Sequence, residues 1–334
     1  MNDSSQSDTC RTTLRGRLGV ITLERRSALN ALNLDMIEAL HAALDDIATQ
    51  HGIELILIRS TSDKAYCAGG DMKRIRELAL AERYDEIHAF FDREYALNLR
   101  LATSPKPVMA LVDGIAMGGG LGISVHGRYC VVSERSLFGM PESRIGFFPD
   151  VGGTHFLPRL PKRAGWWMAC TAESVTGPMA VRLGLASHLI ASDTLEHFVA
   201  ALEDTSAGSI DEVVGTFCKA REALPDDPAT EATLDARAAW FADASSTASR
   251  ERLAAAATGG NTDAATLLDK LDGASPHTLA VIETLFDDNA TASLEAALAR
   301  ELEQSAITAR HPDFIEGVRA VLVDKDRNPK WVER

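Results

Sequence analysis

The chain has 334 residues, of which 46% are hydrophobic and 25% charged, a composition typical of a folded protein with a large core and a smaller additional part. Its formal net charge of −14 argues against nucleic acid as the main partner, because phosphate binding requires a basic surface. No apolar run approaches the roughly 20 residues that a membrane-spanning helix needs, so no membrane partner is expected either.

The start of the chain is polar and lacks both the charged start and the apolar stretch of a secretory signal. We therefore expect residues 1–12 to form a disordered tail. The five cysteines are scattered and form no C-x-x-C pair, so neither a disulfide framework nor a metal site is predicted. A reducing, cytoplasmic location fits this cysteine pattern best.

The first half of the chain predicts strands that alternate with helices. Residues 14–24 alternate as a strand pair, and Asn33 is a suitable N-cap for a helix over 34–50. The elements expected after it are a strand over 53–58, helices over 72–81 and 82–103, a strand over 108–112, a helix near 119–127, and short strands over 129–132 and 137–140. This order is typical of an α/β core.

Helices dominate the prediction after about residue 160. Residues 204–275 are rich in Ala, Asp, Thr and Ser with weak apolar periodicity, so they are expected to be the least rigid part. We predict a core that carries the active site over residues 13–200 and a helical C-terminal region over 201–334.

Two glycine turns, at residues 68–71 and 117–120, each precede a predicted helix. Glycine lets a backbone N–H group face a ligand without a Cβ in the way, and a helix N-terminus adds partial positive charge. Two such N–H groups that converge on one point would form an oxyanion hole. Each turn alone is equally consistent with a tight strand-to-helix connection.

Two acids, Glu142 and Asp150, each directly follow a proline within an apolar segment. Proline stiffens the loop, and burial among apolar side chains raises the pKa of a carboxyl group toward the range useful for proton transfer. The acids could instead cap nearby backbone groups. The chain has no P-loop, no dinucleotide fingerprint, no G-x-S-x-G and no H-E-x-x-H, so hydrolysis would depend on carboxylates.

Together these motifs resemble the crotonase (enoyl-CoA hydratase/isomerase) superfamily, and within it the 3-hydroxyisobutyryl-CoA hydrolases. The segments that carry the resemblance are 67–71, 91–98, 114–120, 124–127, 140–142, 145–153, 156–160 and 316–326. The resemblance implies an α/β fold of the crotonase-like (ClpP/crotonase) kind, a stack of ββα units with a helical C-terminal region.

By this resemblance, the N–H groups of Gly70 and Gly119 form an oxyanion hole for a thioester carbonyl. Glu142 matches one catalytic glutamate of the hydratases, whereas the other corresponds to Gly122, which cannot act. Asp150 stands where the hydratases commonly carry glycine, and this departure favours hydrolysis over hydration. The substrate-binding residues implied are Glu94, which matches a substrate-contacting glutamate, together with Gly119, Glu142 and Asp150.

The phosphates of CoA would need local positive charge on a protein that is acidic overall. The candidates are Lys73 and Arg74, after the first glycine turn, and Lys325 and Lys330 near the C-terminus. Each is also consistent with solvated surface charge. No cofactor is expected, because CoA is part of the substrate.

The implied activity is hydrolysis of 3-hydroxyisobutyryl-CoA to 3-hydroxyisobutyrate and CoA, a step of valine catabolism. Glu142 would either activate water or attack the thioester directly, and the division of roles between Glu142 and Asp150 stays open. The alternatives are an enoyl-CoA isomerase or hydratase of the same superfamily and a non-catalytic acyl-CoA-binding protein. The superfamily's typical trimer makes a homo-oligomer the expected assembly.

Overall fold

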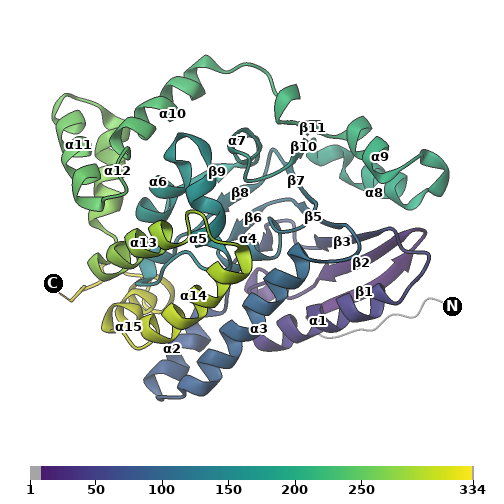
Figure 1. Ribbon diagram of the computed structural model, residues 1–334, viewed down its shortest axis with the longest axis horizontal. Coiled ribbons are helices and arrows are strands. Elements are labelled where there is room, and N and C mark those ends of the chain that lie inside the picture. Colours follow the sequence, from purple (N-terminus) through teal and green to yellow (C-terminus); the bar gives the residue numbers. More distant parts are fainter. Residues whose placement is uncertain (1–8, 333–334) are drawn as a thin grey trace. The chain divides into compact units, whose positions relative to one another are not determined.

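Strands and helices alternate through the first half of the chain in the computed structural model, which describes residues 9–332 (Figure 1). Within this range a seven-stranded sheet has the order β1-β2-β3-β5-β7-β10-β11. Neighbouring strands from β2 to β10 pair in parallel, and the edge strands β1 and β11 are antiparallel to their neighbours. The strands are Cys10–Arg15 (β1), Leu18–Leu23 (β2), Leu55–Ser60 (β3), Val108–Val112 (β5), Tyr129–Ser133 (β7), His188–Ile190 (β10) and Lys219–Ala220 (β11).

A second sheet of short strands has the order β4-β6-β8-β9. Its strands are Ala65–Cys67 (β4), Ile115–Met117 (β6), Leu137–Gly139 (β8) and Ser174–Thr176 (β9). The strands β3, β5 and β7 of the large sheet are each followed by one short strand, and β4 and β6 then lead into the helices α2 and α4. This repetition confirms the predicted stack of ββα units.

The helices of the first half lie close to their predicted positions. They are Leu34–Ala48 (α1), Met72–Leu80 (α2), Tyr84–Ala102 (α3) and Gly119–Gly122 (α4). Asn33 is the N-cap of α1, since its side chain accepts a hydrogen bond from Met36 N at 3.1 Å. The helix expected near 119–127 is wrong in length, because α4 ends after one glycine-rich turn. Ser124 Oγ there donates to Leu121 O (3.1 Å), a local bond that competes with a helix.

The remaining helices confirm the predicted helical C-terminal region. They are Gly153–Phe156 (α5), Ala164–Thr171 (α6), Gly177–Leu183 (α7), Leu195–Glu203 (α8), Ile210–Phe217 (α9), Pro228–Trp240 (α10), Ser246–Thr258 (α11), Thr262–Asp272 (α12), Pro276–Asp288 (α13), Leu294–Thr308 (α14) and Pro312–Val318 (α15). Residues 204–275, expected to be the least rigid part, are largely helical. Their weak apolar periodicity reflects narrow buried faces. In α10, for example, Leu234 is the one residue that is buried.

Two compact units are formed by segments that interleave along the sequence. Unit 1 contains the described part of residues 1–70 together with 93–138 and 175–225, and unit 2 contains 71–92, 139–174 and the described part of 226–334. This division differs from the predicted boundary at residue 200. The tail expected over residues 1–12 falls mostly outside the described residues, and it is wrong for 10–12, which belong to β1.

The core of unit 1 lies against the large sheet. Strands β2 and β5 are buried along their whole length, as expected for parallel strands that are covered on both faces. One face packs on α8 and α9 through apolar side chains that include Phe198 and Val213. On the other face, Ile21 and Ile58 border the same small apolar space as Leu40 of α1 and Leu97 of α3.

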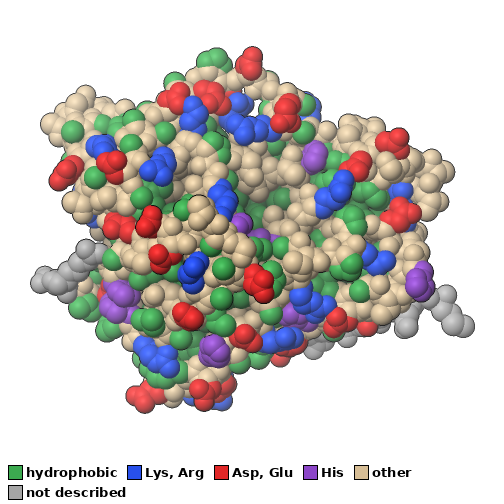
Figure 2. Space-filling view, in the orientation of Figure 1, with side chains coloured by type: hydrophobic (Ala, Val, Ile, Leu, Met, Phe, Trp, Pro, Cys, Tyr) green, Lys and Arg blue, Asp and Glu red, His purple; other side chains and the backbone are tan. Residues whose placement is uncertain are grey.

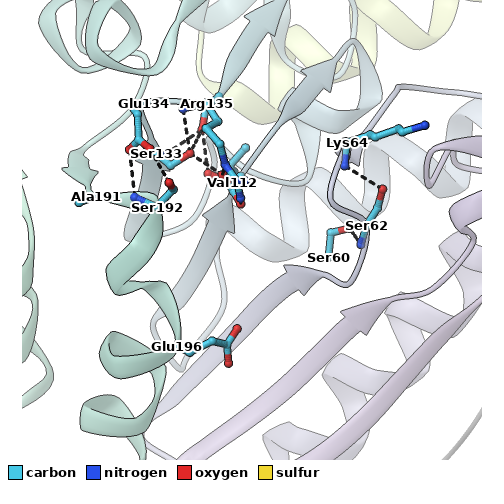
Figure 3. Close-up of polar contacts among 12 residues, drawn as sticks. Ser60, Ser62, Lys64, Val112, Ser133, Glu134, Arg135, Ala191, Ser192 and Glu196 are labelled. Atoms are coloured by element: carbon cyan, nitrogen blue, oxygen red, sulfur yellow. Dashed lines mark hydrogen bonds and ion pairs between the residues drawn. The ribbon is translucent and has the colours of Figure 1, made fainter.

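Hydrogen bonds fix the loops that follow the carboxyl ends of the parallel strands (Figure 3). After β3, Ser62 N donates to Ser60 Oγ (2.9 Å) and Lys64 N donates to Ser62 Oγ (3.2 Å). After β10, Ser192 N donates to Glu134 Oε2 (3.0 Å), which joins the ends of β10 and β7.

The loop between β5 and β6 is held by Asp113. Its carboxylate accepts hydrogen bonds from Ser133 Oγ (2.6 Å) and Arg135 Nε (3.0 Å). The next residues bond to the loop after β3, since Ile115 N donates to Lys64 O at 3.1 Å. The two connections that lead into the glycine turns are therefore fastened to each other.

We expect Gly120→Ala to lower the free energy of unfolding by about 1–3 kcal/mol, the usual range for overpacking. A Cβ on Gly120 would overlap the carbonyl oxygen of Cys67, which is backbone and cannot move aside easily. Urea unfolding followed by circular dichroism measures the change. Gly215→Ala on α9 is the control, because no atom lies within 4 Å of the added methyl group and a gain of about 0.5–1 kcal/mol is expected. Equal effects of the two substitutions would contradict this packing.

Candidate active site

The two glycine turns meet in unit 1, backbone against backbone. Gly69, after β4, has φ +101°, and Gly118, after β6, has φ +47°, a region of backbone conformation that favours glycine. A Cβ on Gly69 would lie 3.0 Å from Met117 O and 3.7 Å from Gly119 N. The absence of side chains therefore allows the turn after β4 to approach the turn after β6.

This approach brings the amides of Gly70 and Gly119 together, as the sequence predicts for an oxyanion hole. A Cβ on Gly119 would lie 3.3 Å from Gly70 N. Within the part of the chain that the structure describes, neither N–H group donates to a protein acceptor. Backbone donors are rarely left unpaired inside proteins, so this pair is suited to a ligand oxygen that carries negative charge.

Glu94 lies beside these amides, on helix α3. Its side chain is only 2% exposed, and its Oε1 occupies the space that a Cβ on Gly119 would need. Burial, and to a smaller degree the charge of Glu94, raise the pKa of the Cys67 thiol to about 12, although a backbone hydrogen bond of Gly69 opposes this. Cys67 is consequently not a thiolate nucleophile near neutral pH.

Asn98, one helical turn after Glu94, is a polar residue that the sequence analysis did not single out. It is fully buried, and within residues 9–332 neither its Oδ1 nor its Nδ2 has a hydrogen-bond partner. Residues four apart share a helix face, so Asn98 and Glu94 lie on the same side of α3. The four-residue spacing could have suggested that Asn98 lies on the same face as Glu94. However, an asparagine in a helix gives no signal that it is buried.

Glu142, in unit 2, begins a short 3-10 helix directly after Pro141. It is buried, and within the described residues its Oε2 has no hydrogen-bond partner. Its loop is stiffened by Phe147 and Phe148, which are both fully buried and stack with their centroids 4.8 Å apart. Burial raises the pKa of Glu142 well above its ordinary value, and the negative charge of Asp150 raises this pKa further. Such a carboxyl group stays protonated to a higher pH than an ordinary glutamate and is a stronger base once it is ionised.

Asp150 is likewise buried and lies in a strained turn. Gly153 N donates to Asp150 O at 2.6 Å, which closes the turn just before α5. Val151, a β-branched residue, has φ +52°, and Gly152 has φ +83°. A positive φ at valine is unfavourable, and such strain is frequent at functional sites.

Glu301, on α14, is an acid that the sequence analysis missed. It is fully buried and accepts hydrogen bonds from Gly152 N (2.7 Å), Thr154 N (3.0 Å) and Thr154 Oγ1. Burial raises its pKa to about 8, with a further increase from the charge of Asp150, although the bonds from Thr154 and Gly152 oppose this shift. Its neighbours in the sequence, Arg300 and Glu303, are exposed, so the segment looks like a surface helix.

The four candidates for the CoA phosphates are all exposed residues of unit 2. Arg74 pairs with Glu77 at 3.1 Å, and Lys330 Nζ donates to Asn328 Oδ1 at 3.1 Å. Lys73 and Lys325 are exposed as well. On the face drawn in Figure 2, outside the grey atoms, basic and acidic side chains are interspersed. A role of these four residues in CoA binding stays a prediction.

The family follows from comparison with known proteins. The family model for enoyl-CoA hydratase/isomerase matches residues 18–334, so the chain belongs to the enoyl-CoA hydratase/isomerase family, as its motifs predict. Among solved structures, a carnitinyl-CoA dehydratase from Mycobacterium thermoresistibile has a TM-score of 0.88 and 29% identity, covering 97% of this chain and 92% of its own. An enoyl-CoA hydratase from Rhodobacter sphaeroides 2.4.1 has a TM-score of 0.86 and 33% identity, covering 98% and 93%.

Curated relatives that all carry the same name have a higher sequence identity to this chain than these two solved structures. The 3-hydroxyisobutyryl-CoA hydrolase, mitochondrial, of Xenopus tropicalis is 38% identical over 335 residues, which cover 99% of this chain and 86% of the relative. The protein of the same name in Homo sapiens is 36% identical over 321 residues, covering 95% and 82%. The relatives' names place them in mitochondria, and a cytoplasmic location of this chain stays a prediction. Within the described residues, no helix has the length and apolar character needed to cross a membrane.

We expect Asp150→Asn to lower the pKa of Glu142, because the substitution removes a like charge that opposes ionisation. The pKa should nevertheless stay above its ordinary value, since burial persists. Carbon-13 titration of the Glu142 carboxyl carbon measures the shift. Asp92→Asn, at an exposed position of α3, is the control and should leave the titration unchanged. An unshifted Glu142 in Asp150→Asn would refute the coupling.

Proposed function

We propose that this protein hydrolyses the thioester of 3-hydroxyisobutyryl-CoA, giving 3-hydroxyisobutyrate and CoA, the reaction expected in valine catabolism. The observation that carries the proposal is the similarity to 3-hydroxyisobutyryl-CoA hydrolases, which extends over nearly the whole of this chain and over 82–86% of the relatives. The paired amides and the buried acids support it, because they supply the groups that cleavage of a thioester needs.

The first step places the thioester carbonyl oxygen on the N–H groups of Gly70 and Gly119. Negative charge develops on this oxygen as the carbonyl carbon is attacked, and fixed donors stabilise the charge more than water would. Loss of one such donor typically costs on the order of 3 kcal/mol of transition-state stabilisation. The two amides are unpaired in the described protein, so they need not first give up another bond.

Glu142 acts in its ionised form. It removes a proton from the attacking water, or it attacks the carbonyl carbon to give a mixed anhydride that water then cleaves. In both routes the carbon–sulfur bond breaks and CoA leaves as a thiolate, which is a good leaving group, so no strong general acid is required. Both routes require ionised Glu142, so activity should rise with pH through the apparent pKa of the Glu142–Asp150 pair.

Asp150 contributes its charge and its position. A negative charge beside Glu142 makes that carboxylate a stronger base, because the charge raises its pKa. A carboxylate fixed by a strained turn can also orient the water or the substrate. Neither role requires Asp150 to form a bond to the acyl group.

Glu94 would give selectivity for a hydroxylated acyl group. Its buried carboxylate borders Gly119 and can accept a hydrogen bond from a substrate hydroxyl. A site built for a hydroxyl leaves its own polar group unpaired when the substrate lacks one, so the discrimination can be strong.

The alternatives belong to two other classes. An enoyl-CoA hydratase or isomerase agrees with the names of similar solved structures, but Gly122 of α4 stands where hydratases use a second glutamate. A non-catalytic acyl-CoA-binding protein would not need buried carboxyl groups with raised pKa values.

The assembly we propose is the trimer that is typical of the superfamily. Light scattering of the purified protein would detect it.

Glu142→Gln should lower the rate of thiol release from 3-hydroxyisobutyryl-CoA at least about 100-fold, in line with loss of a general base or nucleophile. A chromogenic thiol reagent measures the CoA released. Glu251→Gln, at an exposed position of α11, is the matched control and should keep full activity. Hydration of crotonyl-CoA by the wild type should be negligible, and hydration as fast as thiol release would favour the hydratase alternative.

Substrate preference tests Glu94. The wild type should cleave 3-hydroxyisobutyryl-CoA with a kcat/KM on the order of 100-fold or more above that of isobutyryl-CoA, which lacks the hydroxyl. Glu94→Ala should reduce this ratio. The measurement is initial-rate kinetics with both thioesters under identical conditions. Equal kcat/KM values for the wild type would make a general acyl-CoA thioesterase the better assignment.

A further inference from the structure

The geometry points to Glu301 as a positioning residue that holds Asp150 for the reaction, through the backbone and side chain of the segment that follows Asp150. This inference rests on the proposed function, which it extends by a residue outside the predicted active site. Glu301 lies on α14, 149 and 147 positions further along the chain than Gly152 and Thr154, whose N–H groups donate to it.

Glu301 uses both carboxylate oxygens on the segment after Asp150. Its Oε2 accepts from Gly152 N at 2.7 Å, and its Oε1 accepts from Thr154 N at 3.0 Å and from Thr154 Oγ1. Each acceptor is fully enclosed, since Glu301 is 0% exposed. A buried clamp of this kind determines the position of the backbone more firmly than an exposed one, because hydrogen bonds are stronger where water is excluded.

The turn needs such a clamp because its conformation is strained. Val151 and Gly152 both have positive φ, and only Gly152 adopts that region readily. A strained backbone persists only where the surrounding structure enforces it. Hydrogen bonds to Gly152 and Thr154, on the far side of Val151 from Asp150, are suited to enforce it.

The clamp has polar support but no ion-pair partner. Asn289 Nδ2 donates to Thr154 Oγ1 (2.8 Å), and Arg300 Nη1 donates to Asn289 Oδ1 (2.7 Å). Arg159 donates instead to the backbone oxygens of His155 and Asn289. Within the described residues Glu301 has no salt bridge, so no cation stabilises its ionised form, which is consistent with its raised pKa.

Electrostatic coupling gives the clamp a second effect. Burial, followed at a smaller level by the charge of Asp150, raises the pKa of Glu301 to about 8. Coupling is reciprocal, so an ionised Glu301 must also raise the pKa of Asp150. The other titratable and charged groups around the turn are Glu142, His155, Arg159 and Arg300; the pKa of His155 is lowered by burial and by Arg159. With a pKa of about 8, Glu301 is mostly uncharged below that pH, so its charge should act on the acid pair only on the alkaline side.

The main experiment compares the wild type with Glu301→Gln in the hydrolysis of 3-hydroxyisobutyryl-CoA. We expect kcat to fall about 10-fold to 100-fold, the effect of a small misplacement, with KM within about threefold. We also expect the wild-type kcat profile to change near pH 8, where Glu301 ionises, and the variant to lack this change, which loss of a merely structural contact would not cause. Glu303→Gln, exposed on the same helix, is the matched control and should change neither.

Two further variants keep the test decisive. Asp150→Asn combined with Glu301→Gln should be no slower than Asp150→Asn alone, because Glu301 acts through Asp150. If the double variant is instead slower than Asp150→Asn by the same factor that Glu301→Gln costs in the wild type, the inference is overturned. If Glu301→Gln does not fold, as judged by circular dichroism and thermal unfolding, Thr154→Val replaces it. That variant removes one donor to Glu301 and should lower kcat by a smaller factor, and an unchanged kcat would count against the clamp.

A measurement without substrate separates this inference from the proposed function. In the wild type, the carbon-13 resonance of the Asp150 carboxyl should show a titration step near pH 8, where Glu301 ionises, and Glu301→Gln should lack this step. An unchanged titration in the folded variant overturns the role of Glu301, whatever the enzyme's substrate. A wild type that releases no thiol from 3-hydroxyisobutyryl-CoA overturns the proposed function instead.

Discussion

The close approach of two glycine turns is the constraint on which the proposed oxyanion hole of unit 1 depends. A Cβ on Gly120 would overlap Cys67 O, and a Cβ on Gly69 would press on Met117 O, so backbone meets backbone with no side chain between. The parallel sheet makes this approach possible, because the connections after β3 and β5 leave the same edge and are bonded to each other. The amides of Gly70 and Gly119 lie close together as a result.

Unit 2 addresses a different physical problem, the burial of negative charge. Glu142, Asp150 and Glu301 are all at most 7% exposed, and Glu142 and Glu301 each have a raised pKa that depends partly on Asp150. Within the described residues these acids do not form a group able to hold a metal ion. Burying like charges together opposes folding, so such an arrangement indicates chemistry rather than stability.

Sequence reasoning succeeded where a local signal exists. The helix cap at Asn33, the apolar parallel strands and the two glycine turns were predicted because dihedral preference, periodicity and side-chain size act over a few residues. Glu301 and Asn98 were missed for the opposite reason. Both lie on helices with polar neighbours, and their burial is decided by residues distant in the sequence. The length of α4 was overestimated because a run of glycine can begin a helix but does not continue it.

The burial of every cysteine has a consequence for an enzyme whose proposed product is itself a thiol. All five cysteines are free and buried, and burial raises the pKa of Cys67, Cys130 and Cys218 to about 12. Thiol–disulfide exchange requires an accessible thiolate. Free CoA or its disulfide would therefore find no reactive partner on the folded protein. The folded protein should therefore tolerate a high concentration of free CoA, or oxidising conditions, without forming a mixed disulfide that blocks its turnover.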